Sequence, residues 1–373
     1  MRIGVPTEIK NHEYRVGLAP AAARELVHHG HEVLVQAGAG LGIGAADADY
    51  AAAGAKLLPD AAAVFAKAEM IVKVKEPQLA ECRMLKPGQV LFTYLHLAPD
   101  PEQAEALMAS GCTAIAYETV TAAGGSLPLL APMSEVAGRM SIQAGAHHLE
   151  KAQGGRGVLL GGTPGVQPGK VVILGGGVAG TNAAHVAVGV GADVTILEKS
   201  LARIRHLDEV FNGRVRTVYS TVDAVETLVS TADLVIGSVL IPGASAPKLI
   251  TRALLKKMLP GSVVVDIAID QGGCLETSRA TTHDAPTFVE EGVIHYCVAN
   301  MPGAVARTST MALNNATLPY ALALADKGWK TALADDAGLK DGLNVHAGKI
   351  TFKAVAEALR READYRAADA CLA

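Results

Sequence analysis

Residues 170–180 (KVVILGGGVAG) constrain the fold of this chain more than any other stretch. The apolar run 171–174 predicts a buried strand, and residues 181–190, rich in Ala and Val and free of proline, predict a helix. Between them Gly175, Gly177 and Gly180 form the pattern G-x-G-x-x-G. In a strand–turn–helix context these glycines allow a tight turn, the approach of a pyrophosphate, and close packing of helix on strand. The stretch therefore predicts a dinucleotide site, with a glycine-rich turn of an ordinary α/β core as the alternative.

An acidic residue follows at the position where such sites bind the adenine ribose. A second strand is predicted over 193–197, and Glu198 lies 18 positions after Gly180. A carboxylate there accepts hydrogen bonds from the ribose hydroxyls and repels a 2′-phosphate, which favours NAD over NADP. Arg203 is close enough to Glu198 to leave this preference open.

Length and composition limit the classes of protein that fit. A length of 373 residues suggests two domains, and half of the residues are hydrophobic. The net charge of −4 argues against a nucleic-acid or anionic-membrane partner, and no run resembles a membrane span. Residues 1–4 read as the start of a strand rather than a signal peptide. Five dispersed cysteines without C-x-x-C indicate reduced thiols in a cytoplasmic protein.

The segment 1–130 alternates short apolar runs with Ala-rich stretches, which predicts a mostly parallel sheet covered by helices. We expect strands over 2–5, 32–36, 70–75, 90–94 and 113–117, and helices over 21–29, 47–53, 60–67 and 101–110. A long helix is expected over 134–151, with Ser134 as its N-cap, and the loop 154–169 leads to the fingerprint strand.

The alternation resumes after Glu198 and completes a six-stranded dinucleotide domain. We expect further strands over 214–218, 233–236, 262–267 and 294–298, and helices over 222–230 and 251–259. A helix over 308–326, interrupted at Pro319, and a helical segment over 353–366 follow. The sequence thus predicts an α/β protein with two doubly wound, Rossmann-like domains joined by long helices, with the active site in the cleft. The first domain would be discontinuous, formed by 1–130 and 307–373, and the NAD-binding domain would be 131–306.

Polar residues follow several predicted strands, where open α/β sheets bind their ligands. Arg15, Lys75 and His96 lie after strands of the first domain, and Asp270 and Asn300 after strands of the second. Each alone fits a solvated loop, a strand face or a turn. Lys73 and Lys75 alternate with valines, so both are expected on one strand face. Together these residues supply a cation clamp for a carboxylate and an acid/base pair, as oxidation at an amine- or hydroxyl-bearing carbon requires.

Seven stretches in order along the whole chain resemble the L-alanine dehydrogenase family. They are 1–11 with 13–16 (MRIGVPTEIKN, EYRV), 72–77 (VKVKEP), 92–98 (FTYLHLA), 128–135 (PLLAPMSE), 175–180 (GGGVAG), 265–273 (VDIAIDQGG) and 300–305 (NMPGAV). The resemblance implies an amino-acid dehydrogenase of catabolism that interconverts L-alanine, NAD and water with pyruvate, ammonium and NADH, as a homohexamer.

The resemblance also implies roles for individual residues. Arg15 and Lys75 match residues that bind the substrate, and His96 and Asp270 match the acid/base pair. The positions expected to line the cofactor are Ser134, Gly175, Gly177, Val178, Gly180, Glu198, Arg203, Ser220, Val239, Leu240, Ile267, Asp270, Val298, Asn300 and Met301.

The chain departs from the family at two places. Glu198 stands where the family often has Asp, which keeps the charge on a longer side chain. Ala323 and Lys327 stand where some members have a Glu and a His that hold a divalent ion, so no metal is expected. Two other functions remain open: an NAD-binding subunit of transhydrogenase type, against which Lys75 and His96 argue, and a non-catalytic NAD-binding module.

Overall fold

The computed structural model describes residues 1–239 and 246–372, and the chain in it divides into two compact units. Unit 1 comprises Met1–Pro132 and Val305–Ala373, and unit 2 comprises Met133–Ala304. The first boundary falls near the start of helix α6 (Ala131–His148) and the second just before helix α11 (Ala306–Lys327).

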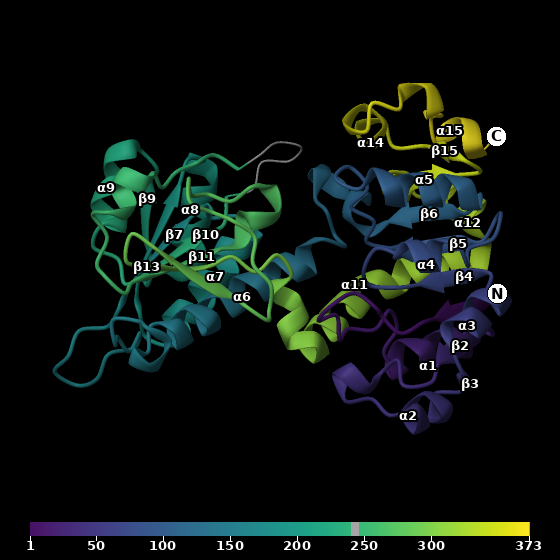
Figure 1. Ribbon diagram of the computed structural model, residues 1–373, viewed down its shortest axis with the longest axis horizontal. Helices are drawn as coiled ribbons and strands as arrows, with labels where there is room; N and C mark the ends of the chain where they lie inside the picture. The colour runs from purple at the N-terminus through teal and green to yellow at the C-terminus, as the bar shows by residue number, and fades with distance from the viewer. Residues whose placement is uncertain (240–245, 373) are drawn as a thin grey trace. The chain divides into compact units, whose positions relative to one another are not determined.

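Unit 1 is built on an eight-stranded sheet in the order β15-β14-β6-β5-β4-β1-β2-β3 (Figure 1). The first six strands of the chain are mutually parallel, β14 pairs antiparallel with β6, and β15 pairs antiparallel with β14. The strands are β1 (Arg2–Val5), β2 (Glu32–Gln36), β3 (Lys56–Leu58), β4 (Met70–Val72), β5 (Val90–Thr93), β6 (Thr113–Ala116), β14 (Leu343–His346) and β15 (Lys349–Ile350). Chain order reverses between neighbours β1 and β4, so unit 1 is doubly wound with its switch point there.

The helices of unit 1 connect these strands in the expected alternation. They are α1 (Pro20–His28), α2 (Asp47–Ala52), α3 (Ala61–Lys67), α4 (Leu79–Cys82) and α5 (Pro101–Ser110), followed in the C-terminal segment by α11, α12 (Trp329–Asp335), α13 (Ala337–Lys340), α14 (Lys353–Ala358) and α15 (Asp369–Leu372). Short 3-10 turns are η1 (Leu41–Ile43), η2 (Tyr117–Thr119), η3 (Ala123–Gly125) and η7 (Glu362–Asp364). Because β14 pairs with β6, the C-terminal segment completes the first sheet, and unit 1 is discontinuous along the chain.

Unit 2 has a seven-stranded sheet in the order β12-β13-β11-β10-β7-β8-β9. All six predicted strands are present and parallel, and β12 pairs antiparallel with β13 at one edge. The elements are η4 (Lys151–Gln153), β7 (Lys170–Leu174), α7 (Val178–Gly189), β8 (Asp193–Glu198), α8 (Leu201–Phe211), β9 (Arg216–Tyr219), α9 (Val222–Val229), β10 (Leu234–Gly237), α10 (Arg252–Leu255), β11 (Val263–Asp266), η5 (Ile267–Gln271), β12 (Thr287–Glu290), β13 (Val293–Tyr296) and η6 (Met301–Val305). The switch point lies between β7 and β10, beside the glycine turn.

Alternate residues of the same strands enter two separate apolar cores, which shows that helices cover both faces of this sheet. Val171 and Ile173 belong to one core with residues of α6, α7 and α8, whereas Val172 and Leu174 belong to the other with residues of α9 and α10. Side chains of a strand point alternately to opposite faces, so a continuous apolar run is what a strand buried on both sides requires.

Several predicted boundaries were wrong, each for a local reason. The long helix begins at Ala131 and not after a Ser134 cap, because Pro132 is tolerated in a first helical turn. Helix α11 continues through Pro319, whose lost hydrogen bond is outweighed by the packing of this 22-residue helix. The strand expected over 70–75 ends at Val72.

The C-terminal segment departs most from expectation. The helical pattern over 353–366 becomes α14 and the 3-10 turn η7, and strands β14 and β15 were not predicted. Strands β3 and β12 were also missed, and α10 is shorter than expected. The missed strands are short: β3, β12 and β15 lie at sheet edges and β14 lies between β15 and β6, so they depend on pairing with distant segments more than on local periodicity.

Candidate active site

The predicted substrate residues of unit 1 all lie where parallel strands end. Arg15 follows β1, Lys75 follows β4 and His96 follows β5, and Glu118 follows β6 within η2. Since carboxyl ends of parallel strands lie on one edge of the sheet, the topology brings these four side chains to the same edge. The structure thus gathers three residues that the sequence had only placed in separate loops.

Arg15 is buried, with 3% of its surface exposed, and its guanidinium is paired with Glu13. Nε donates to Glu13 Oε1 at 2.7 Å, and a terminal nitrogen donates to Glu13 Oε2 at 2.5 Å. The loop around it is anchored to α11: the Val16 amide donates to Thr310 Oγ1 at 3.3 Å, and the Ala19 amide donates to Asn314 Oδ1 at 2.6 Å. Glu13 thus fixes the side chain of Arg15, and α11 fixes the loop on which Arg15 stands.

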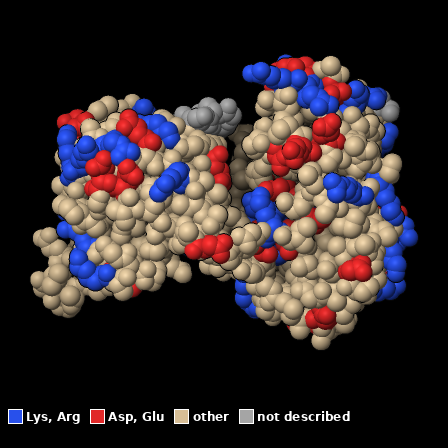
Figure 2. Space-filling view, in the orientation of Figure 1, with Lys and Arg blue, Asp and Glu red and all other residues tan. Residues whose placement is uncertain are grey.

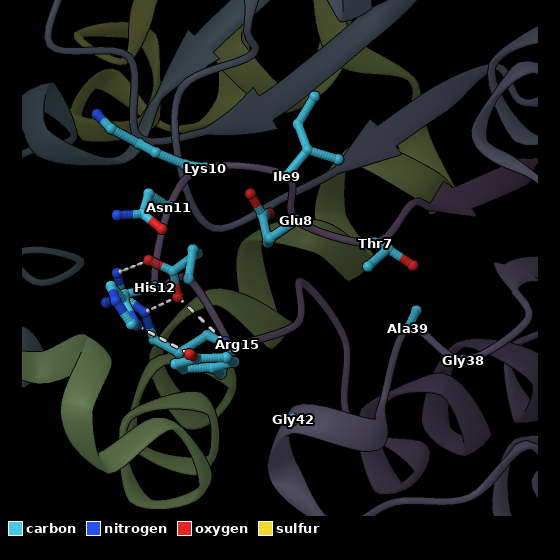
Figure 3. Close-up of a pocket in the computed structure, with 12 residues that line it drawn as sticks. Thr7, Glu8, Ile9, Lys10, Asn11, His12, Arg15, Gly38, Ala39 and Gly42 are labelled. Atoms are coloured by element: carbon cyan, nitrogen blue, oxygen red, sulfur yellow. Dashed lines mark hydrogen bonds and ion pairs between the residues drawn. The ribbon is translucent and has the colours of Figure 1, made fainter. Parts of the chain in front are cut away.

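A pocket of about 420 Å³ opens beside this loop (Figure 3). The loop after β1 supplies most of its wall, and the loop after β2 closes it; the lining residues are Thr7, Glu8, Ile9, Lys10, Asn11, His12, Glu13, Tyr14, Arg15, Gly38, Ala39 and Gly42. Its wall carries two cationic side chains, Lys10 and Arg15, and two carboxylates, Glu8 and Glu13, and its lining does not include Lys75 or His96.

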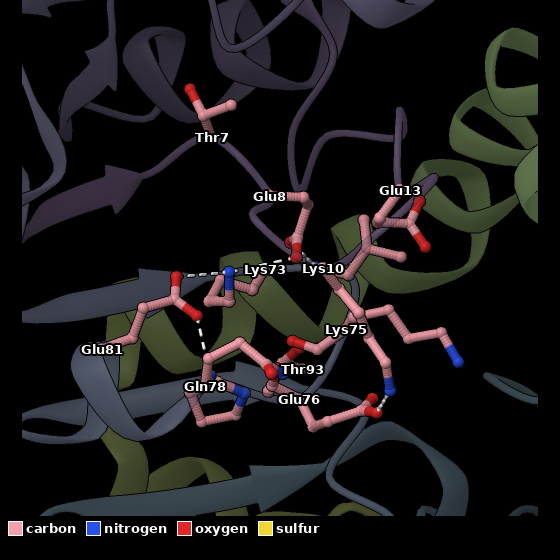
Figure 4. A network of polar contacts seen from close by, with 12 residues as sticks. Thr7, Glu8, Lys10, Glu13, Lys73, Lys75, Glu76, Gln78, Glu81 and Thr93 are labelled. Atoms are coloured by element: carbon pink, nitrogen blue, oxygen red, sulfur yellow. Dashed lines mark hydrogen bonds and ion pairs between the residues drawn. The ribbon is translucent and has the colours of Figure 1, made fainter.

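A buried ion network joins the loops after β1 and β4 (Figure 4). Lys73 is fully buried, and its Nζ donates to Glu8 Oε2 at 3.0 Å and to Glu81 Oε1 at 2.8 Å. Glu8 Oε1 also accepts the Val74 amide at 2.6 Å, and Lys73 O accepts the Tyr117 hydroxyl at 3.0 Å. Burial opposes the charged form of Lys73, but Glu8 and Glu81 outweigh it, and the pKa of Lys73 is raised. Burial also opposes the charged form of Glu8; there it outweighs the attraction of Lys73, and the pKa of Glu8 is raised as well. One lysine between two carboxylates fixes the backbone that leads to Lys75.

His96 has a left-handed backbone, with φ of 48°, and an imidazole that is 43% exposed. Glu118 Oε1 accepts the His96 amide at 2.6 Å and the Leu95 amide at 3.2 Å. These two bonds stabilise the strained conformation. The Tyr94 ring stacks on the imidazole, with centroids 5.7 Å apart and planes at 23°. Backbone and ring are thus both held, as a proton carrier in a fixed site requires.

The imidazole lies in a cluster of charges. His96 Nδ1 is 3.6 Å from Glu76 Oε2, and the other oxygen of Glu76 pairs with Lys10 Nζ. Although partial burial opposes protonation, Glu76 and then Glu118 raise the pKa of His96, while the charge of Lys75 lowers it. Burial opposes ionisation of Glu76 as well, but His96, Lys75 and Lys10 bring its pKa well below the usual range.

In unit 2 the glycine turn has the geometry of the fingerprint. Gly175 has a φ of 96°, which favours glycine, and a Cβ on Gly180 would lie 1.9 Å from the Gly175 carbonyl oxygen. A Cβ on Gly177, in contrast, would meet no atom of residues 1–239 or 246–372 within 4 Å. The described part of the chain gives no steric reason for glycine at position 177, and the space there fits a ligand phosphate against the backbone and the N-terminus of α7.

Glu198 and Arg203 hold the glycine turn from its two sides. Glu198 Oε2 accepts the Gly176 amide at 2.8 Å, and Oε1 accepts the amides of Lys199 and Ser200 at 2.7 and 2.9 Å. Arg203 Nε donates to the Gly176 carbonyl at 2.6 Å, and its Nη2 donates to Thr181 Oγ1 at 2.7 Å. Arg203, which left the cofactor preference open in the sequence, is engaged here with the Gly176 carbonyl and the Thr181 hydroxyl.

The other predicted cofactor residues lie mostly at the carboxyl ends of strands in unit 2. Ser220 follows β9, Val239 follows β10, Ile267 and Asp270 lie in η5 after β11, and Val298, Asn300 and Met301 follow β13. Val178 begins α7 and Ser134 lies in the first turn of α6, while Leu240 lies outside the described residues. The carboxylate of the buried Asp266 accepts the Ala268 amide at 3.1 Å and the Cys274 amide at 2.8 Å, which holds η5 and its exposed Asp270 in place.

The carboxylates that support these residues were not predicted from the sequence; they are Glu8, Glu13, Glu76, Glu118 and Asp266. Glu8, Glu13, Glu76 and Asp266 lie within stretches already singled out, and the acidic residues close to Lys10, Arg15 and Lys75 in the sequence were the available signal. Among residues 1–239 and 246–372, no group of three or more His, Cys, Asp or Glu side chains is arranged to hold a metal ion. In the same part of the chain, no helix has the length and apolar character needed to cross a membrane. On the face drawn in Figure 2, acidic and basic side chains are interspersed on both units.

Comparison with protein families matches residues 4–137 to the alanine dehydrogenase/PNT N-terminal domain and residues 141–353 to the corresponding C-terminal domain. The chain is 63% identical to an alanine dehydrogenase of Halomonas elongata, over 97% of this chain and 98% of that protein. It is 57% identical to an alanine dehydrogenase of Mycolicibacterium smegmatis, over 96% and 97% of the two chains.

Two solved structures resemble the whole chain. An L-alanine dehydrogenase superposes with a TM-score of 0.94 at 54% identity, covering 96% of this chain and 99% of the other. A transhydrogenase of Sinorhizobium meliloti superposes with a TM-score of 0.82 at 25% identity, covering 95% and 100%.

Proposed function

The chain belongs to the alanine dehydrogenase/PNT family, and we propose that it is an amino-acid dehydrogenase that catalyses the NAD-dependent oxidative deamination of L-alanine to pyruvate and ammonium, and the reverse reductive amination. The observation that carries the proposal is the 63% identity to an alanine dehydrogenase over 97% of the chain. The gathering of Arg15, Lys75 and His96 at one sheet edge supports it chemically.

We assign substrate binding to unit 1. We assign binding of the substrate carboxylate to Arg15, whose guanidinium Glu13 holds in place through Nε and one terminal nitrogen. Lys75 stabilises the charge that develops on the carbonyl oxygen when ammonia adds to pyruvate or water leaves. His96, held between Tyr94 and Glu76, moves the proton in these steps, because an imidazole titrates near neutral pH.

We assign cofactor binding to unit 2. The residues that would hold the dinucleotide are those of the glycine turn, Glu198, and the loops after β9, β10, β11 and β13. When bound, the nicotinamide supplies or accepts the hydride at the substrate carbon. Asp270, at the end of β11, is the second proton-moving group of the proposed site, and Asp266 fixes the turn on which it stands.

NAD is the proposed form of the cofactor. Glu198 places a carboxylate at the carboxyl end of β8, where a 2′-phosphate would meet its charge. Kinetics with NADH and NADPH test this directly: we expect NADH to be used far more efficiently, and equal kcat/KM values would refute the assignment of Glu198.

We further propose a homohexamer that works in the cytoplasm. The family resemblance supports the assembly. Leu159 and Val166, on the loop before β7, are 71% and 62% exposed, and another copy would cover these apolar side chains. Light scattering of the purified protein should report a large closed oligomer, and a stable, active monomer would contradict this.

The decisive experiment for the activity is oxidation of NADH with ammonium and a panel of 2-oxo acids. We expect turnover with pyruvate and the reverse reaction with L-alanine. Binding of NADH without turnover of any member of the panel would refute the proposal and favour a transhydrogenase-type or non-catalytic NAD-binding role.

A further inference from the structure

We propose that Glu76 is a positioning residue for His96: its carboxylate accepts a hydrogen bond from Nδ1–H of the imidazole, so that Nε2 is left to accept and return the substrate proton, and Lys10 competes for the same carboxylate. The inference deepens the proposed function, because it rests on His96 as the proton carrier of the site.

The argument starts from the two oxygens of Glu76. Its side chain is only 11% exposed, and Oε1 is occupied by Lys10 Nζ. Among the described residues, Oε2 is buried and has no hydrogen-bond donor within reach. His96 Nδ1 lies 3.6 Å from this oxygen, which is longer than a hydrogen bond. A buried carboxylate oxygen without a donor is costly, and a small rotation of the imidazole provides the donor.

The backbone of His96 limits what that rotation can do. Glu118 accepts the amides of both Leu95 and His96, and the left-handed φ of 48° fixes the direction in which the side chain leaves the chain. Tyr94 stacks on one face of the ring. With the backbone and one ring face held, rotation brings Nδ1 toward Glu76 and leaves Nε2 for the substrate side, which is the arrangement of a base oriented by a carboxylate.

Charged and titratable groups from four segments of unit 1 face this imidazole. Lys10 comes from the loop after β1, Lys75 and Glu76 from the loop after β4, Tyr94 from the end of β5, and Glu118 from η2. Burial raises the pKa of Tyr94 above its usual range, so this phenol stays neutral. Glu76 and Glu118 therefore raise the proton affinity of His96, and Lys75 lowers it. Lys10 acts indirectly, through its ion pair with Glu76.

Two substitutions test the pairing because they have opposite expected signs. Glu76→Gln removes the carboxylate charge and should lower the pKa of His96 by about one unit, whereas Lys10→Met removes the competing cation and should raise it. The matched control is Glu32→Gln, which removes an exposed carboxylate paired with Lys56 in the same unit. It should leave His96 unchanged.

The pKa of His96 is measured without reference to activity, from the pH dependence of carbethoxylation of the His96 peptide followed by mass spectrometry in the full-length protein. Unchanged values in both variants, or shifts of the same sign, would overturn the pairing. Circular dichroism and NADH affinity, which should match the unmodified protein, exclude a general loss of structure.

The pH profile of kcat/KM then separates this proposal from the function on which it rests. If His96 carries the proton, the acidic limb of the profile should move with the measured pKa, to lower pH in Glu76→Gln and to higher pH in Lys10→Met. If the pKa of His96 shifts in opposite directions in the two variants but the acidic limb of the kcat/KM profile stays in place, the pairing of Glu76 with His96 is supported and the role of His96 in the reaction is refuted.

Discussion

Replacing Lys73 by Met removes the single cation from the buried network at the switch point of unit 1. Its ammonium is fully buried between Glu8 and Glu81, and both carboxylates are themselves buried. Breaking a buried ion pair by deleting one partner typically costs about 3–5 kcal/mol, because a charge is left without compensation. Here two carboxylates lose the same partner, so we expect Lys73→Met to lose at least about 3 kcal/mol of unfolding free energy at pH 8.

The loss should depend on pH with a definite sign. Burial already raises the pKa of Glu8 in the folded protein, and removing Lys73 raises it further. A carboxyl group whose pKa is raised in the folded state favours folding below its unfolded pKa, and this contribution is lost as the pH rises through the folded pKa. The loss of unfolding free energy in Lys73→Met, relative to the unmodified protein, should therefore be smallest near pH 4 and largest near pH 8.

The single tryptophan of the chain makes the assay specific. Trp329 lies on α12 in unit 1, so its fluorescence during urea unfolding reports on the unit that contains the network. NADH binding reports on unit 2, where no change is expected. Lys56→Met, which removes a cation from an exposed pair with Glu32, is the matched control and should leave the midpoint nearly unchanged.

A rescue variant separates charge from packing. Lys73→Met combined with Glu8→Gln and Glu81→Gln removes all three charges, while the amide oxygens still accept the Val74 and Gln78 amides. This variant should recover most of the stability. A single-variant deficit under about 1 kcal/mol, or one equal at pH 4 and pH 8, would refute the reasoning.

Three further predictions concern the site. His96→Ala should reduce kcat by about 10²–10⁴-fold while NADH affinity and thermal stability stay nearly intact; full turnover in a folded variant would remove His96 from the mechanism. Gly177→Ala should weaken NADH binding in titrations, because its Cβ occupies the space proposed for the phosphate, and should leave the melting temperature unchanged, because that Cβ meets none of the described residues. Gly180→Ala should instead destabilise unit 2, because its Cβ clashes with the Gly175 carbonyl. Equal losses of stability in the two variants would contradict this. Activity should survive thorough treatment with EDTA, and activity lost on chelation and restored by a divalent ion would overturn the expectation of a metal-free site.

The local patterns of the sequence predicted most strands of both sheets because each pattern is a property of neighbouring residues. The apolar run before Gly175 has to be buried on both faces, and the spacing of the three glycines suits a turn between strand and helix. The same reasoning placed Arg15, Lys75 and His96 after strands. It extended β4 to include Lys73 and Lys75, because alternation alone cannot show where a strand stops pairing.

What the sequence by itself determined, then, is the alternation of strands and helices, the position of the glycine turn and the set of polar residues at strand ends. The tertiary structure decided which segments meet: Glu8 pairs with Lys73 across 65 residues, and Glu118 holds the His96 backbone across 22. It also decided that Lys73 is buried as part of an ion network and that β14 returns to pair with β6. The physical reason is that periodicity and turn preference act between near neighbours, whereas burial of a charge depends on partners that only the folded chain brings within reach.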